Sequence, residues 1–88
     1  MKVKTGYILR KIAGHYVVLP SGARTVEFVG VITLNDSGAF LWENMNEDVT
    51  EEGLLEKLMT EYSIDRETAL QDVQNFVALL EKNSLLDT

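Results

Sequence analysis

The stretch that decides the fold is residues 30–43, GVITLNDSGAFLWE. It contains the end of a β-prone run that begins at Val26, and from Asn35 onward the apolar residues follow the period of a helix. Asn35 or Asp36 is suited to cap that helix, because a short side-chain oxygen can accept a hydrogen bond from an N–H group of the first turn. The pattern predicts a strand over 26–34, followed at once by a helix that ends at 46–48.

Two more β-prone runs come before this stretch, at residues 7–12 and 15–19. Only Ala13-Gly14 separates them, and two such runs around a short glycine-containing break are typical of a β-hairpin. Pro20 ends the second run and opens a turn. We therefore expect an N-terminal three-stranded antiparallel sheet made of these two runs and the strand over 26–34.

Two helices are expected after the first one. Thr50 caps the earlier of the two, which closes at Tyr62, and the later one runs from Asp65 to about Lys82. Asn83 is placed to adopt the left-handed conformation that often ends a helix. The chain should then return to the core through its last leucines, Leu85 and Leu86. Three strands followed by three helices predict an α+β fold that is winged helix-turn-helix-like.

Composition limits the chemistry that this chain can perform. Its 88 residues are 45% hydrophobic and contain no cysteine, so we expect a single domain over residues 1–88 without disulfides. His15 is the only histidine, and neither a phosphate-binding loop nor a nucleophile motif is present. We expect no catalytic residues, no metal site and no cofactor. The apolar runs are shorter than the roughly 20 residues of a membrane span. With no signal peptide recognised at the N-terminus, we expect a cytoplasmic protein without a membrane partner.

Charge is divided unevenly along the chain, whose net charge is −6. Residues 1–24 contain five basic and no acidic residues, whereas the other 64 contain three basic and fourteen acidic residues. The basic segment is either an ordinary solvated surface or a docking surface for a partner. The acidic helices would repel phosphates, so we expect no nucleic-acid partner.

The last predicted helix carries more apolar surface than one stripe requires. Leu79 lies beside that stripe, on a shoulder next to Phe76 and Asp72. Two interpretations remain open: Leu79 is a lone surface leucine, or Phe76 and Leu79 form the floor of a groove beside the third strand. The third strand is apolar on both faces, and its second face requires a cover or a partner. The residues of the stripe are Ala69, Leu70, Val73, Phe76, Val77 and Leu80.

The order of these features resembles the PqqD family, named for protein D of pyrroloquinoline quinone (PQQ) biosynthesis. The resemblance starts from residues 30–43, where a strand ends in Leu-Asn and small residues precede an apolar pair and Trp. It covers nearly the whole chain. The later residues that carry it are Thr50-Glu51-Glu52, Glu61-Tyr62, Asp65, Ala69, Asp72-Val73, Phe76-Val77, Leu79 and Leu85-Leu86.

The resemblance implies a peptide-binding function. Members of this family are recognition elements for ribosomally made, modified peptides. They bind the leader of a precursor peptide and present it to a modifying enzyme, often a radical S-adenosylmethionine enzyme. The leader is added as a strand to the third strand, against the third helix. The site residues implied in this way are Val29, Gly30, Val31 and Ile32 on the strand, and Asp72, Asn75, Phe76 and Leu79 on the helix.

Two other interpretations use the same elements. A DNA-binding winged helix is the alternative function, with the basic hairpin as its wing. Acidic residues on its recognition helix argue against it, because they would face the phosphates. A homodimer through the free strand edge is compatible with peptide binding, since an unpaired edge can pair with a second copy.

Overall fold

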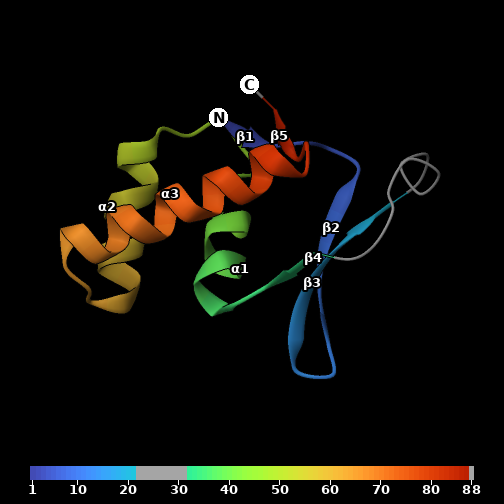
Figure 1. Ribbon diagram of the computed structural model, residues 1–88, viewed down its shortest axis with the longest axis horizontal. Coiled ribbons are helices and arrows are strands. Elements are labelled where there is room, and N and C mark those ends of the chain that lie inside the picture. Colours follow the sequence, from blue (N-terminus) through green and yellow to red (C-terminus); the bar gives the residue numbers. More distant parts are fainter. Residues whose placement is uncertain (22–31, 88) are drawn as a thin grey trace.

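The computed structural model describes residues 1–21 and 32–87, and a three-stranded antiparallel sheet lies at one side of the three helices (Figure 1). The strand order is β2-β3-β4, so β3 pairs on both sides. Tyr16 of β3 lies opposite Leu34 of β4, and Val18 lies opposite Ile32. The predicted sheet is confirmed. Its strands are β2 (Tyr7–Ile12), β3 (His15–Pro20) and β4 (Ile32–Leu34).

One strand ends later than the sequence predicts, and another can be compared with its prediction only in part. Pro20 is the last residue of β3 rather than the residue that follows it, and it pairs with Tyr7. Of the predicted strand over 26–34, only the part from Ile32 onward can be compared. Residues 26–31 lie outside the described residues.

The three predicted helices are present, and each begins at the predicted place, behind a side chain that caps it. The side chains of Asn35, Thr50 and Asp65 accept hydrogen bonds from backbone N–H groups three residues later. The helices are α1 (Asp36–Glu43), α2 (Glu51–Tyr62) and α3 (Arg66–Lys82). The predicted end of the first helix at 46–48 is wrong. Asn44 ends it earlier, because its side-chain amide donates to the Phe40 carbonyl oxygen at 2.8 Å.

The end of α3 corrects a second prediction. Asn83 has a φ of −101°, and the left-handed residue is Ser84, with a φ of 57°. The N–H of Leu85 donates to the Leu80 carbonyl oxygen at 2.8 Å, and that of Ser84 donates to Glu81 at 3.2 Å. This pair of bonds is a Schellman motif, and the fully buried leucines at its two ends complete it.

The two ends of the chain form a small sheet that the sequence did not predict. Strand β1 (Lys2–Val3) pairs antiparallel with β5 (Leu86–Asp87). The amide of Lys4 donates to the Leu85 carbonyl oxygen at 2.8 Å. Figure 1 shows the two termini next to each other, at the C-terminal end of α3.

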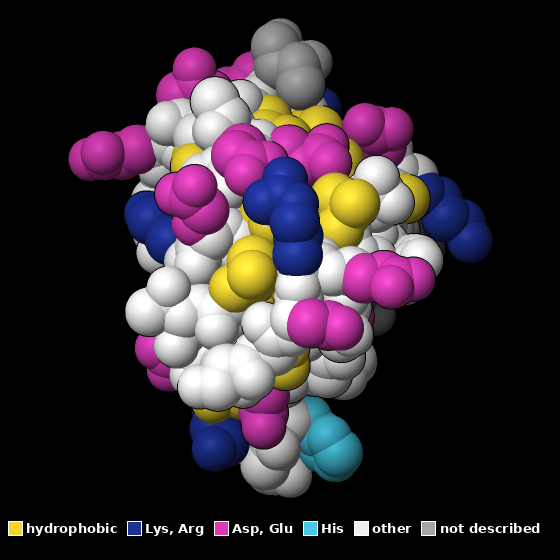
Figure 2. All heavy atoms as spheres, turned by 90° about the vertical axis from the view of Figure 1, so that its left-hand side faces the viewer, with side chains coloured by type: hydrophobic (Ala, Val, Ile, Leu, Met, Phe, Trp, Pro, Cys, Tyr) yellow, Lys and Arg dark blue, Asp and Glu magenta, His cyan; other side chains and the backbone are white. Residues whose placement is uncertain are grey.

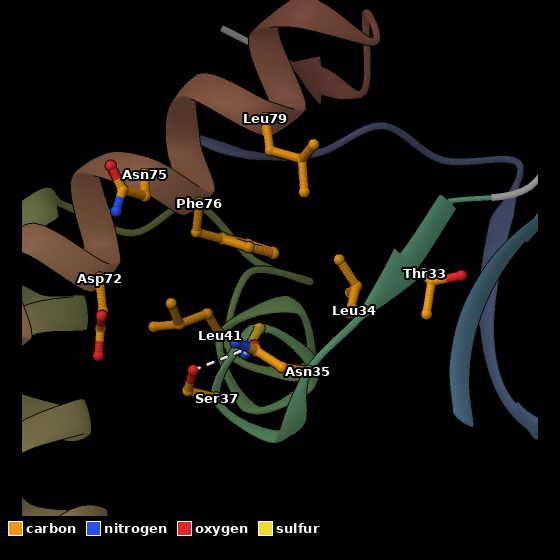
Figure 3. Close-up of a pocket in the computed structure, with 10 residues that line it drawn as sticks. Thr33, Leu34, Asn35, Ser37, Leu41, Asp72, Asn75, Phe76 and Leu79 are labelled. Carbon is orange, nitrogen blue, oxygen red and sulfur yellow. Dashed lines mark hydrogen bonds between the residues drawn. The ribbon is translucent and has the colours of Figure 1, made fainter. Parts of the chain in front are cut away.

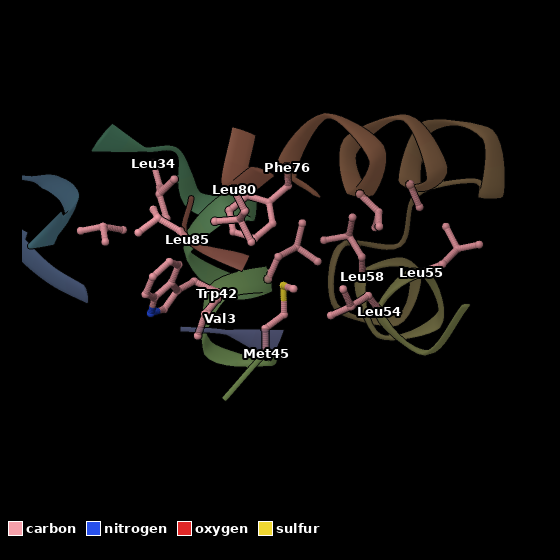
Figure 4. Packing of buried hydrophobic residues seen from close by; sticks show 14 residues of the cluster. Val3, Leu34, Trp42, Met45, Leu54, Leu55, Leu58, Phe76, Leu80 and Leu85 are labelled. Atoms are coloured by element: carbon pink, nitrogen blue, oxygen red, sulfur yellow. The ribbon is translucent and has the colours of Figure 1, made fainter. Parts of the chain in front are cut away.

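The hydrophobic core lies between the sheet and the three helices, and α1 crosses its middle. Figure 4 shows Trp42 beside Val3 at one end of the cluster and the leucines of α2 at the other. Trp42 is 4% exposed and is therefore a core residue. None of the helices in the described part of the chain has the length and apolar character that crossing a membrane requires.

The surface over α2 and the start of α3 is mainly acidic. Figure 2 shows Asp and Glu side chains spread across this face, with few Lys and Arg side chains between them. One pair is neutralised: Arg66 donates two hydrogen bonds to the Glu52 carboxylate, at 2.9 and 2.8 Å. Most of the acidic residues counted in the sequence thus remain at the surface.

Candidate functional site

A groove of about 390 Å³ lies between α3, β4 and the start of α1. Figure 3 shows the side chains of Phe76 and Leu79 extending from α3 toward Leu34 of β4. The groove is therefore where the sequence placed it, between the third strand and the third helix. It is lined by Thr33, Leu34, Asn35, Ser37, Gly38, Leu41, Asp72, Asn75, Phe76 and Leu79.

The wall formed by α3 follows from helical spacing. Asp72, Asn75, Phe76 and Leu79 are separated by three, one and three residues, which places them along one side of the helix. Phe76 is buried, whereas Leu79 is half-buried and packs against the core from the outside. Leu79 is therefore not a lone surface leucine, and the groove interpretation is the one that the geometry supports.

The floor of the groove depends on a close approach between α1 and α3 at Gly38. A Cβ atom at Gly38 would lie 3.0 Å from the Asn35 Oδ1 atom and 3.3 Å from the Leu34 Cβ atom. The Phe76 ring would be 3.6 Å away. A Cβ atom at this position would therefore press on the cap oxygen of Asn35 and on Leu34, while its contact with Phe76 would be an ordinary one.

The first turn of α1 presents polar groups to the same groove. The Asn35 Oδ1 atom accepts hydrogen bonds from the Gly38 N–H at 2.8 Å and from the Ser37 hydroxyl at 3.1 Å. These bonds hold the turn in place next to the apolar side chains. The groove is thus apolar around Phe76 and Leu79 and polar where α1 begins.

Two polar side chains stand on α3 at the rim. The Asn75 Oδ1 atom accepts a hydrogen bond from the Gln71 side-chain amide at 3.1 Å. Asp72 is half-buried, and none of its neighbours in the described residues forms an ion pair or hydrogen bond with its carboxylate. Asp72 is therefore available to a donor or cation on a ligand.

The predicted site residues divide into three groups. Asp72, Asn75, Phe76 and Leu79 are brought together in the groove. Ile32 lies on β4 and packs partly against the core, but its side chain does not line the groove. Val29, Gly30 and Val31 lie outside the described residues.

Sequence reasoning missed the residues that α1 and the end of β4 contribute. Ser37, Gly38 and Leu41 line the groove, and so do Thr33, Leu34 and Asn35. The sequence did contain one signal for them, which is the boundary between strand and helix at Asn35. Residues just before and just after this boundary lie near the end of β4, beside the predicted groove. No group of His, Cys, Asp and Glu side chains suited to a metal ion occurs within the described ranges.

The fold and the groove together define a small α+β domain with a groove beside β4, which is the last strand of the sheet formed by the described residues. A sequence model described as "Coenzyme PQQ synthesis protein D (PqqD)" matches residues 15–86, and the chain therefore belongs to the PqqD family. The predicted resemblance is confirmed. No curated protein matches the sequence.

A solved structure confirms the fold. It is described as "TbiB1 in Complex with the TbiA(beta) Leader Peptide" and is similar to this chain with a TM-score of 0.75. The similarity covers 99% of this chain and 95% of that chain, at 24% sequence identity. The fold is thus shared over nearly the whole of both chains.

Proposed function

We propose that this protein is a non-catalytic recognition protein that binds the leader of a ribosomally made precursor peptide in the groove between β4 and α3. The observation that carries the proposal is the combination of an edge strand and an apolar helix face in one groove. Membership of the PqqD family supports it, and so does the leader peptide bound by the structurally similar TbiB1.

The leader is proposed to bind by strand addition. Among the described strands, β4 is last in the strand order, and β3 occupies one of its two edges. A peptide on the other edge gains main-chain hydrogen bonds, while its side chains enter pockets on either side. We assign this role to the backbone of Ile32, and to Val29, Gly30 and Val31, which precede β4 in the sequence.

The side chains of α3 are proposed to supply selectivity. Phe76 and Leu79 offer an apolar surface on which a leucine or aromatic residue of the leader can be buried. Asp72 and Asn75 stand beside it and suit a basic or polar leader residue. A leader that combines an apolar residue with a nearby basic one would match both.

The enzyme that receives the leader is proposed to be a radical S-adenosylmethionine enzyme in the cytoplasm. This rests on the resemblance to peptide recognition elements that work with such enzymes. The basic β2–β3 hairpin is available to a partner enzyme, because the side chains of Arg10 and Lys11 are exposed on β2. A homodimer through β4 would occupy the edge that the leader uses, so leader binding should dissociate any such dimer.

The test uses the leader of a candidate precursor peptide, chosen from short reading frames near this protein's gene and titrated by calorimetry. We expect Leu79→Asp to weaken leader binding at least about tenfold. Burying a carboxylate against an apolar leader residue should cost more than about 1.4 kcal/mol of binding free energy. The matched control is Leu70→Asp. Leu70 is also half-buried on α3. Because it is nine residues from Leu79, which is about two and a half turns, it lies on the opposite side of the helix.

A folded Leu79→Asp protein that binds the leader as tightly as the unchanged protein would remove α3 from the site.

Strand addition is tested by a separate measurement. Upon leader binding, hydrogen exchange at one or more amides of residues 32–34 should slow markedly. Unchanged exchange there, with the leader bound, would show that the peptide lies elsewhere.

A further inference from the structure

A second hollow of about 370 Å³ lies on another side of α1, between the β2–β3 hairpin and the end of α2. Asp36, Phe40 and Glu43 face it, whereas Ser37 and Leu41 face the groove beside α3. It is called the aromatic hollow below. Its principal lining residues are Lys11, Tyr16, Asp36, Phe40, Glu43 and Tyr62.

Aromatic rings from three elements meet in the aromatic hollow. The rings of Phe40 and Tyr62 stand edge to face, with centroids 5.8 Å apart and an interplanar angle of 89°. Tyr16 adds a third ring from β3. Tyr62 is 39% exposed, and only Ile12 is a comparably exposed large apolar residue in the described part of the chain. Aromatic surface therefore remains open to solvent here.

The carboxylates of the aromatic hollow are not neutralised within the protein. Neither Asp36 nor Glu43 forms an ion pair with another described residue. Glu43 is the last residue of α1, where the helix dipole disfavours an anion, and the last turn holds no basic residue. Burial raises the pKa of Tyr62, and the charges of Asp36, Glu61 and Glu43 act in the same direction. All these groups favour a cation at this place.

A cation already contacts one of the rings. The Lys11 ammonium lies 5.3 Å from the centroid of the Tyr16 ring, within the range of a cation–π interaction. Lys11 is an exposed side chain on a flexible stem, so a stronger cation can replace it. The site thus accepts positive charge on an aromatic face, and its two carboxylates remain unused.

We infer that the aromatic hollow docks an arginine side chain of a partner protein. A guanidinium group can pair with a carboxylate through two hydrogen bonds and also stack on an aromatic ring, whereas an ammonium group is a strongly hydrated point charge. Phosphate-bearing partners are disfavoured by the two carboxylates. The inference goes beyond leader binding, because it gives the protein a second contact surface separate from the groove beside α3.

The test uses N-acetyl-arginine amide as the probe and N-acetyl-citrulline amide as its uncharged control. Both are titrated into the ¹⁵N- and ¹³C-labelled protein and followed by NMR. We expect the arginine probe to shift the ring resonances of Tyr16, Phe40 and Tyr62 in a saturable manner. The citrulline probe has nearly the same shape and should leave them almost unchanged at equal concentration.

Two variants with opposite expected effects sharpen the test. Glu43→Gln should weaken binding of the arginine probe by about fivefold, the loss expected for one ion pair. Lys11→Gln should strengthen it by about twofold or more, because the competing cation is gone. Glu47→Gln is the matched control: it removes the same charge from an exposed residue outside the aromatic hollow, and it should change little.

Equal shifts with the citrulline probe, or equal losses of arginine-probe affinity in Glu43→Gln and Glu47→Gln, would overturn the inference.

The titration is repeated with the leader present at saturation. Arginine binding without leader binding would refute only the proposed function. Leader binding without arginine binding would refute only the aromatic hollow.

Discussion

Among single residues, Trp42 has the largest expected effect on stability. It is 4% exposed and packs in the same core cluster as Val3, Leu34 and Leu85 (Figure 4). Replacement by alanine should lower the free energy of unfolding by about 3–5 kcal/mol, because the cavity cannot fully collapse. The total free energy of unfolding of a domain of this size is about 4–13 kcal/mol, so the loss would be a large share of the protein's stability.

Urea unfolding followed by circular dichroism measures this loss. The control is Ile12→Ala, since Ile12 is 51% exposed on the hairpin and should lose less than about 1 kcal/mol. Equal losses in the two variants would contradict the placement of Trp42 in the core.

The cap of α3 gives a prediction about pH. Hydrogen bonds from Thr68 hold the pKa of the Asp65 carboxyl below its ordinary value of 3.8. A lowered pKa means that the charged cap stabilises the folded state above pH 3.8, and that this contribution is lost as the pH falls through the lower, folded value. Acid should therefore destabilise the protein partly through Asp65.

Asp65→Asn tests this, because asparagine keeps a capping oxygen and carries no charge. Between about pH 5 and pH 2, the free energy of unfolding should fall less steeply in this variant than in the unchanged protein. Some slope should remain, because hydrogen bonds from Arg66 also lower the pKa of Glu52. Superimposable pH curves for the two proteins would contradict a role for Asp65.

At the scale of elements, local signals predicted best. The caps at Asn35, Thr50 and Asp65 act on backbone N–H groups three residues away, so neighbouring residues in the sequence are sufficient to predict them. Strands β1 and β5 have two residues each and pair across almost the whole chain. Two residues show no period, and nothing local indicates a partner so far away.

The candidate groove was predictable on its α3 side only. Helical spacing places Asp72, Asn75, Phe76 and Leu79 together without knowledge of the tertiary structure. The contribution of Gly38 depends on how closely α3 approaches α1, with the Phe76 ring 3.6 Å from the position of a Cβ atom. Such a distance follows from the packing of the whole core and has no signature in the sequence.

The pairing of the chain ends gives a prediction for β5. Leu85 precedes β5, is fully buried and completes the Schellman motif at the end of α3. Leu85→Ala should lower the free energy of unfolding by about 2–5 kcal/mol, and it should speed hydrogen exchange at the Lys4 amide. The half-buried neighbour Leu86 is the control, since Leu86→Ala should lose clearly less. Equal effects at both positions would show that the end of the chain does not stabilise α3.

At the scale of the whole molecule, charge separates the two candidate functions. The net charge is −6, and the face over α2 and the start of α3 is mainly acidic (Figure 2). On α3 itself, Glu67 and Glu81 are exposed and Asp72 is half-buried. A helix of this kind would meet repulsion in the major groove, whereas an apolar groove beside a strand edge depends little on charge.

Salt titration distinguishes the two. If the leader binds through strand addition and apolar contacts, its dissociation constant should change less than about threefold from 50 to 200 mM salt, because Asp72 is the one charged side chain among the described residues that line the groove. A protein that binds DNA through many phosphate contacts would lose roughly a thousandfold or more in affinity over the same range of salt. The control ligand is a DNA duplex of random sequence. Tight duplex binding with a steep salt dependence, together with weak leader binding, would favour the winged-helix alternative over the peptide-binding function.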